Sequence, residues 1–337
     1  MYLKGRHLLN STDFSIDELS LLIHLAEEIA KNPTEYSEAC KGRVMASLFY
    51  EPSTRTRLSF EAAMKRLGGE VIGFTDPVIS SHSKGESIED TIRTVDCYSD
   101  VIVMRHPEPF KPHKLSTLIS NPLINAGDGS NQHPTQTLAD LFTIYTYKKS
   151  LSNLKIGFCG DLKYGRTVHS LIKVMDRYGG NAFTCISPDS LRLPEEIEKD
   201  LKSEVIKCDH LERSMGDLDI LYMTRIQKER FPTVKEYEKC KSYYILTKEK
   251  MKYAKEDTII MHPLPRVDEI HESVDSDKRA VYFDQARAGM YIRMALILSL
   301  LGINKLQYLR PEWFESFLGD RKQMSGVRFQ VTGCQER

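Results

Sequence analysis

Short apolar runs alternate along the chain with segments whose apolar residues recur every three or four positions. The short runs are typical of strands buried on both faces, and the longer segments are typical of amphipathic helices. The predicted strands are residues 44–50, 71–75, 101–104, 122–125, 154–159, 182–187, 219–223 and 258–261. Strands and helices that alternate in this way predict an α/β protein built on parallel sheets.

Capping residues mark where several helices begin. Ser15 and Glu18 form a capping box, which predicts a helix that ends near residues 32–33. Ser87 with Asp90 predicts a second start, and Pro134 suits the first turn of a helix that leads into the second half of the chain. The last strong helix is predicted from about residue 287 to residue 301.

Residues 49–69, FYEPSTRTRLSFEAAMKRLGG, hold the most informative local pattern. A strand ends before a Glu-Pro pair, and a helical pattern then includes Leu58 and Leu67 and stops at two glycines. Residues 53–56 therefore occupy the first helical turn, where free backbone N–H groups and the helix dipole favour an anion such as phosphate. The alternative is an ordinary N-cap followed by two solvated arginines.

Polar stretches of unusual composition follow six of the predicted strands. They are residues 53–56, 105–107, 127–136, 160–166, 224–230 and 262–266. Ligands of open α/β sheets bind at the carboxyl ends of the strands, so six such stretches predict one composite site.

The composition gives no support for nucleic acid or a membrane surface as a binding partner. The 337 residues, enough for about two domains, include 47 basic and 47 acidic side chains. The seven cysteines are scattered with no C-x-x-C pair, which indicates reduced thiols in the cytoplasm, and Cys159 and Cys185 are predicted to be core residues. No signal peptide or run of membrane-spanning length is seen.

The predicted site is rich in cations. It would contain Arg55, Lys84, Arg105, His133, Arg166 and Arg225. Such a site favours a ligand with several negative charges, and His133 beside Gln136 could donate to a developing oxyanion. Arg287 and Arg293, in contrast, are interpreted as ordinary helix residues.

The sequence shows no pattern that favours covalent, metal or cofactor chemistry. No Ser-His-Asp order, H-E-x-x-H or paired carboxylates stand out, and the glycines at residues 160–165 do not match a dinucleotide loop. A polyanion-binding module without catalysis remains the alternative to an enzyme, although it does not explain a site spread over six strand ends.

Several motifs together resemble the carbamoyltransferase family over roughly residues 5–303. Residues 53–57 (STRTR), 133–136 (HPTQ) and 262–266 (HPLPR) resemble the whole family. Residues 105–107, 160–170, 224–230 and the extended HPLPRVDEI resemble its aspartate branch. The ornithine branch usually has a cysteine where this chain has Pro263, which favours aspartate over ornithine or another amino acid as acceptor.

The resemblance implies two doubly wound parallel-sheet domains joined by two helices, and a homotrimer. Residues 1–134 would bind carbamoyl phosphate and residues 135–286 would bind L-aspartate. A C-terminal helix at about 287–318 would complete the first domain, and residues 319–337 would form a flexible tail. The implied reaction yields N-carbamoyl-L-aspartate, an early step of pyrimidine synthesis, without a metal or cofactor. Binding of a regulatory chain is left open.

The resemblance also assigns roles to individual residues. The phosphate would be held by Ser53, Thr54, Arg55, Thr56 and Arg105. The carbamoyl oxygen would be polarised by Thr56, Arg105 and His133. The carbamoyl NH₂ would be held by Gln136 and by the backbone around Pro263, Leu264 and Pro265. The carboxylates of aspartate would be held by Arg166, Arg225 and Gln227.

Two further assignments concern subunits and domains. Lys84 would arrive from a neighbouring subunit with a serine, either Ser80 or Ser81, since the loop is one residue shorter than is familiar in bacterial members. Glu51 and Arg230 would bridge the two domains in a closed state.

Overall fold

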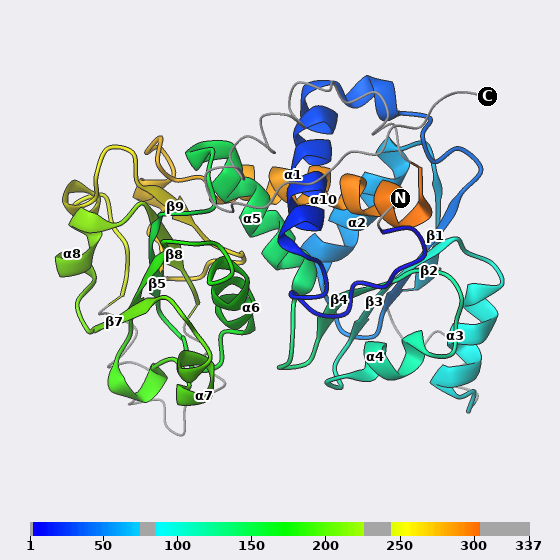
Figure 1. Cartoon of the computed structure of the whole chain (residues 1–337), viewed down its shortest axis with the longest axis horizontal. Helices are drawn as coiled ribbons and strands as arrows, with labels where there is room; N and C mark the ends of the chain where they lie inside the picture. The colour runs from blue at the N-terminus through cyan, green and yellow to red at the C-terminus, as the bar shows by residue number, and fades with distance from the viewer. Residues whose placement is uncertain (1–2, 75–84, 226–243, 304–337) are drawn as a thin grey trace, which may run out of the picture. The chain divides into compact units, whose positions relative to one another are not determined.

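Two parallel sheets organise the computed structural model, which describes residues 3–74, 85–225 and 244–303 (Figure 1). The strand order is β2-β1-β3-β4 in the first sheet and β7-β6-β5-β8-β9 in the second. The strands of the first sheet are β1 Val44–Phe49, β2 Glu70–Phe74, β3 Val101–His106 and β4 Leu123–Asp128. Those of the second are β5 Lys155–Cys159, β6 Ala182–Ile186, β7 Glu204–Cys208, β8 Ile220–Met223 and β9 Ile259–Met261.

Helices connect successive strands, as parallel pairing requires. Those that flank the first sheet are α1 Ile16–Lys31, α2 Thr54–Arg66, α3 Ile88–Asp96 and α4 Lys111–Ser116. The others are α5 Pro134–Lys148, α6 Arg166–Met175, α7 Glu195–Lys199, α8 Leu211–Ser214 and α10 Tyr282–Leu301. The predicted α/β class with two parallel sheets is therefore confirmed.

Local capping explains where two of these helices begin. The Ser15 side chain accepts from the Glu18 N–H, and the Glu18 side chain accepts from the Ser15 N–H, so the predicted capping box of α1 is present. The Ser87 side chain accepts from the Asp90 N–H at the start of α3. Helix α10 begins at Tyr282, five residues earlier than predicted.

Strand β1 is buried on both faces, which explains its continuous apolar sequence. Met45 and Phe49 face the largest core cluster, whereas Ala46 and Leu48 face a second cluster with residues of α3 and α4. In Figure 1, α3 and α4 lie on one side of this sheet, and α1, α2 and α10 lie on the other. The sheet therefore forms the middle layer of three.

Helices α5 and α10 join the two sheets into a continuous core. Helix α5 follows β4, an edge strand of the first sheet, and α10 follows β9, an edge strand of the second. The two helices pack along one another (Figure 1). Leu141 of α5 and Ile292 of α10 belong to the same buried cluster as Ile124 of β4 and Ile156 of β5. Residues up to Ile303 consequently form one compact unit, and the two joining helices implied by the resemblance are present.

Other expectations were incomplete. Strand β7 and helices α4, α7 and α8 were not predicted. Strand β7 has only partly buried or exposed residues, so its sequence lacks a clear apolar run. In α2, Leu58 does not share the buried stripe and is 50% exposed, while Phe60 and Ala63 are fully buried. Both Cys159 and Cys185 are core residues as predicted. Among the described residues, no helix is long and apolar enough to cross a membrane.

Candidate active site

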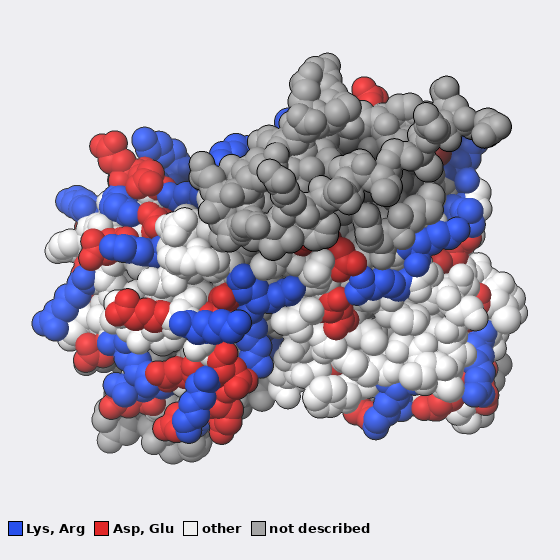
Figure 2. All heavy atoms as spheres, in the orientation of Figure 1, with Lys and Arg blue, Asp and Glu red and all other residues white. Residues whose placement is uncertain are grey.

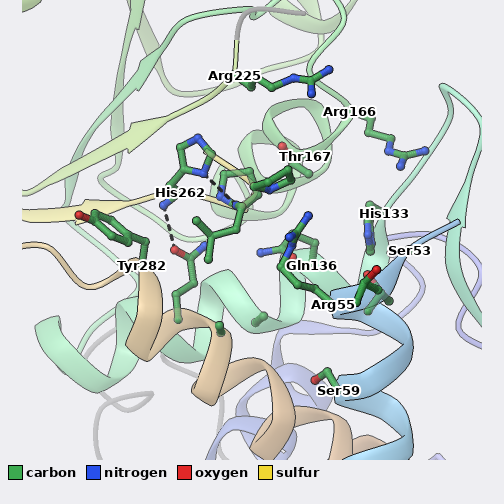
Figure 3. A pocket seen from close by; sticks show the side chains of 18 of the residues that line it. Ser53, Arg55, Ser59, His133, Gln136, Arg166, Thr167, Arg225, His262 and Tyr282 are labelled. Carbon is green, nitrogen blue, oxygen red and sulfur yellow. Dashed lines mark hydrogen bonds between the residues drawn. The ribbon is translucent and has the colours of Figure 1, made fainter. Parts of the chain in front are cut away.

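A pocket of about 770 Å³ lies at the carboxyl ends of strands from both sheets. This volume is within the usual range for small-molecule sites. All six polar stretches that follow predicted strands contribute to its lining, through Arg55, Arg105, His133, Arg166, Arg225 and His262. Figure 3 shows Arg55, His133 and Gln136 around the pocket, with Arg166 and Arg225 across from Arg55. The predicted composite site is therefore present.

The first turn of α2 forms one wall of the pocket. Ser53 is the N-cap residue, yet its hydroxyl makes no capping hydrogen bond. Its hydroxyl is therefore available to a ligand. The first backbone N–H groups of α2 are available too, because no preceding turn supplies carbonyl oxygens for them. Thr54, Arg55 and Thr56 follow on the same turn and also line the pocket. These donors and the positive end of the helix dipole suit a phosphate.

Arg105 is the penultimate residue of β3 and is almost fully buried beside this turn. Its Nε lies 3.0 Å from a carboxylate oxygen of Glu51, and one terminal nitrogen donates to the Ala126 carbonyl at 3.3 Å. The same nitrogen lies 3.5 Å from Nε2 of His133. Gly127 keeps space for the guanidinium, because a Cβ there would lie 2.9 Å from it. Arg105 is thus held with its remaining donors at the pocket.

His133 is the N-cap residue of α5 and is only 6% exposed. Burial first, and then the positive charges of Arg166 and Arg105, lower the pKa of His133 well below 6.5. The imidazole is therefore neutral near pH 7. Its Nδ1 has no hydrogen-bond partner among the described residues. A neutral imidazole retains one N–H, so it can donate to an oxygen of a ligand without carrying a charge.

The second sheet contributes cations to the opposite wall. Arg166 begins α6 and donates to the Gly129 carbonyl, and Arg225 follows β8. Gly160 allows the ends of β5 and β8 to approach, since its φ is +118° and a Cβ would lie 2.5 Å from the Thr224 carbonyl oxygen. Two guanidinium groups at this wall suit carboxylates.

The loop after β9 closes the pocket through a buried hydrogen bond between His262 and Glu269. His262 Nε2 lies 2.7 Å from the Glu269 carboxylate, and His262 Nδ1 accepts from the Leu264 N–H at 2.8 Å. The other Glu269 oxygen accepts from the N–H groups of Val267 and Asp268. This network holds the backbone of Pro263, Leu264 and Pro265 at the pocket wall, where these three predicted residues lie.

Arg293 is a pocket residue that the sequence analysis did not identify. It is 5% exposed, donates to the Ser59 hydroxyl at 2.9 Å and lies 5.1 Å from the centre of the Phe60 ring. Burial lowers its pKa to about 10, so it remains charged. Its interpretation as an ordinary helix residue was wrong, because α10 packs on α2 and directs this position inward. Arg287, on the outer side, is 71% exposed as expected.

Several predicted residues lie outside the described part of the chain. They are Ser80, Ser81, Lys84, Gln227 and Arg230. The bridge between Glu51 and Arg230 therefore stays a prediction, and Glu51 pairs with Arg105 of its own sheet.

The lining is strongly cationic. It includes five arginines, and none of its described residues is an aspartate or glutamate. On the face drawn in Figure 2, by contrast, basic and acidic side chains are interspersed over the described surface. The positive charge is therefore a property of the pocket, which fits the balanced composition of the chain.

Family models match both halves of the chain. Residues 6–146 match the carbamoyl-phosphate-binding domain of aspartate/ornithine carbamoyltransferases, and residues 152–300 match the Asp/Orn-binding domain. The chain belongs to the aspartate/ornithine carbamoyltransferase family.

Individual carbamoyltransferases resemble the chain over most of its length. An aspartate carbamoyltransferase catalytic subunit from Clostridium kluyveri is 57% identical over 305 residues, which cover 89% of this chain and 99% of the relative. A solved aspartate transcarbamoylase from Trypanosoma cruzi, in complex with carbamoyl aspartate and phosphate, is 39% identical with a TM-score of 0.84 and covers 89% of this chain and 97% of its own. The catalytic subunit of the M. Jannaschii enzyme is 45% identical with a TM-score of 0.84, at 89% and 99% coverage.

For a carbamoyltransferase pocket, the charge of the buried histidine is a measurable property. In protein labelled with ¹³C-histidine, the His133 resonance should not titrate between pH 8 and 6, since burial and the three guanidinium groups of Arg166, Arg105 and Arg293 disfavour the charged form. The His133→Asn variant would assign the resonance. In concentrated urea, the same resonance should titrate near the ordinary value of 6.5. A native midpoint at or above 6.5 would contradict the proposed electrostatics.

Proposed function

We propose that this chain transfers the carbamoyl group of carbamoyl phosphate to the amine of L-aspartate, yielding N-carbamoyl-L-aspartate and phosphate. The observation that carries the proposal is one pocket, at strand ends from both sheets, lined by five arginines and by no described carboxylate. Each wall offers donors of a different arrangement, as two different anionic substrates require.

The wall made by α2 and Arg105 would hold carbamoyl phosphate. Ser53, Thr54, Arg55 and Thr56 would donate to phosphate oxygens from the helix N-terminus, together with Arg105. Thr56, Arg105 and His133 would polarise the carbamoyl oxygen. Gln136 and the backbone of Pro263, Leu264 and Pro265 would accept from the carbamoyl NH₂.

The opposite wall would hold L-aspartate. Arg166 and Arg225 would bind its two carboxylates, with Gln227 as a further donor and Lys84 supplied by a neighbouring subunit. Two anions would then lie side by side in a cationic pocket, so binding offsets the repulsion that separates them in water.

The reaction follows from this placement. The unprotonated amine of aspartate would attack the carbamoyl carbon, forming a C–N bond while negative charge develops on the carbamoyl oxygen. The prearranged donors, Thr56, Arg105 and the neutral His133, would stabilise that charge. The C–O bond to phosphate would then break, and the departing phosphate would take the amine proton. All atoms and protons of this reaction come from the two substrates, and the side chains only position them and stabilise charge.

We further propose that residues 1–134 with α10 form the carbamoyl-phosphate domain, that residues 135–286 form the aspartate domain, and that the chain acts as a trimer with shared sites. Support comes from the position of each substrate wall on a different sheet. A polyanion-binding module would bind both ligands without product, so formation of carbamoyl-aspartate only with both substrates tests the enzyme directly.

Removal of Arg55 should abolish most activity. A charge-assisted hydrogen bond contributes roughly 1.5–3 kcal/mol, so Arg55→Ala should lower kcat/KM for carbamoyl phosphate by about tenfold or more. Arg57→Ala on the same helix is the matched control, because Arg57 pairs with Glu61 and is absent from the pocket lining. Colorimetric carbamoyl-aspartate production measures both. Full activity of Arg55→Ala would show that the start of α2 is an ordinary N-cap and not a phosphate site.

The acceptor should be L-aspartate and not ornithine. Arg166 and Arg225 would attract the second carboxylate of aspartate and repel the second amine of ornithine. Kinetics with each acceptor at saturating carbamoyl phosphate provide the comparison. Turnover of ornithine at an equal or higher kcat/KM would contradict the assignment of this wall.

Complementation tests the shared site. Lys84→Gln and Arg55→Ala proteins should each be nearly inactive, and trimers assembled from both should regain activity. Some interfaces would then combine an intact Arg55 with an intact Lys84 from the neighbouring subunit. If mixed trimers form and activity does not return, Lys84 does not act across a subunit boundary.

A further inference from the structure

A fully buried carboxylate lies behind the pocket and receives hydrogen bonds from three elements. Asp140 of α5 is 0% exposed and is absent from the pocket lining. Its Oδ1 accepts from Gln136 Nε2 at 2.8 Å and from Gln285 Nε2 at 2.6 Å. Its Oδ2 accepts from the Tyr222 hydroxyl at 2.9 Å. Asp140 thus connects α5, α10 and β8 and bonds two residues of the pocket lining, Gln136 and Gln285.

The direction of these hydrogen bonds can be traced from a backbone N–H, which is always a donor. The His262 N–H donates to Gln285 Oε1 at 2.9 Å, and Figure 3 marks the bond at His262. The Gln285 amide must therefore present its NH₂ to Asp140. Because that NH₂ donates to Oδ1, Oδ1 is an acceptor.

The same reasoning sets the orientation of Gln136. Its terminal group lies 2.8 Å from an oxygen that accepts, so the group at that position must be the NH₂ and not the carbonyl oxygen. Gln136 also lines the pocket. The amide end that Asp140 does not bind is therefore its carbonyl oxygen, an acceptor.

We propose that Asp140 is a positioning residue that, by holding the Gln136 NH₂, presents the Gln136 carbonyl oxygen to the pocket and so makes the site selective for an acyl phosphate that carries N–H donors. This inference rests on the proposed function and deepens it. Asp140 touches no substrate and acts on the ligand through Gln136, while its hydrogen bond from Gln285 supports the backbone at His262.

Protonation of Asp140 does not change this orientation. Burial raises the pKa of Asp140 to about 7, even though the Gln136 amide and other donors lower it. Two amide groups occupy Oδ1, so a proton would be placed on Oδ2, which faces the Tyr222 hydroxyl. The positive charge of the buried Arg293 also favours the ionised form. In both states Oδ1 remains an acceptor.

Selectivity follows because an acceptor that faces a methyl group is left without a partner. A carbamoyl NH₂ would pair with the Gln136 oxygen, whereas an acetyl methyl would leave it desolvated and unpaired. The pocket should therefore discriminate between two ligands of the same shape by about tenfold, the ratio expected for one unsatisfied group.

Two non-hydrolysable probes isolate this discrimination. Phosphonoacetamide and 2-oxopropylphosphonate share a phosphonate and a carbonyl group. Phosphonoacetamide has an NH₂ on the carbonyl carbon, and 2-oxopropylphosphonate has a CH₃ in its place. Calorimetric titration should show that the unmodified protein binds the amide about tenfold more tightly. In Asp140→Leu, which keeps the branched shape of the side chain with a larger volume and removes the acceptor, the ratio should fall to within about threefold, because Gln136 is free to turn.

Control variants separate positioning from a general loss of structure. Asp140→Asn retains an acceptor for both amides and should preserve the ratio, and Tyr222→Phe, which alters only the Oδ2 side, should preserve it too. Gln136→Ala should lower the ratio as far as Asp140→Leu does, and Asp140→Leu added to it should cause no further change. Asp140→Ala replaces Asp140→Leu if the latter does not fold, as judged by circular dichroism.

The outcomes distinguish the two proposals. An unchanged amide preference in Asp140→Leu or Asp140→Ala would overturn the role of Asp140 and leave the proposed reaction intact. Equal affinity of the unmodified protein for both probes would overturn the orientation of Gln136. Binding of neither probe would overturn the proposed function and this inference with it.

Discussion

The packing of α10 along α5 is the constraint on which the pocket depends. Each helix carries the chain from one sheet to the other, and their shared apolar surface makes one core of both sheets. This contact places the strand ends of each sheet at the same pocket, so residues as distant in sequence as Arg55 and Arg225 can act on one pair of substrates. It also explains why α10 is nearly all buried along its second half and has no strong polar face.

The pocket contains two kinds of hydrogen-bond donor, the charged arginines and the neutral His133. Arg105, Arg166 and Arg293 each donate to a carboxylate, a carbonyl oxygen or a hydroxyl behind them, which fixes the position of their guanidinium groups. His133 lies among those cations, none of the described carboxylates adds to the causes that shift its pKa, and it is neutral instead. The site thus offers strong positive charge to phosphate and carboxylates and an uncharged N–H where a carbonyl oxygen would lie.

Local sequence predicted most of the site because its residues lie within a few positions of a strand end. The motif at residues 53–56 contains both its strand and its helix start, so its role could be inferred without tertiary structure. Arg293 could not be inferred in this way, since its partner Ser59 is 234 positions away. Asp140 was missed for the same reason, because its partners come from α5, α10 and β8.

The central claim is that one pocket holds both anions at once, and a single molecule that joins a phosphonate to a dicarboxylate tests it most directly. Calorimetry should show that N-(phosphonacetyl)-L-aspartate binds at least about a hundredfold more tightly than phosphonoacetamide, because the second anion binds at no further entropic cost. Both phosphate and succinate should compete with it. Displacement by phosphate alone, with succinate ineffective and no gain in affinity over phosphonoacetamide, would contradict the account.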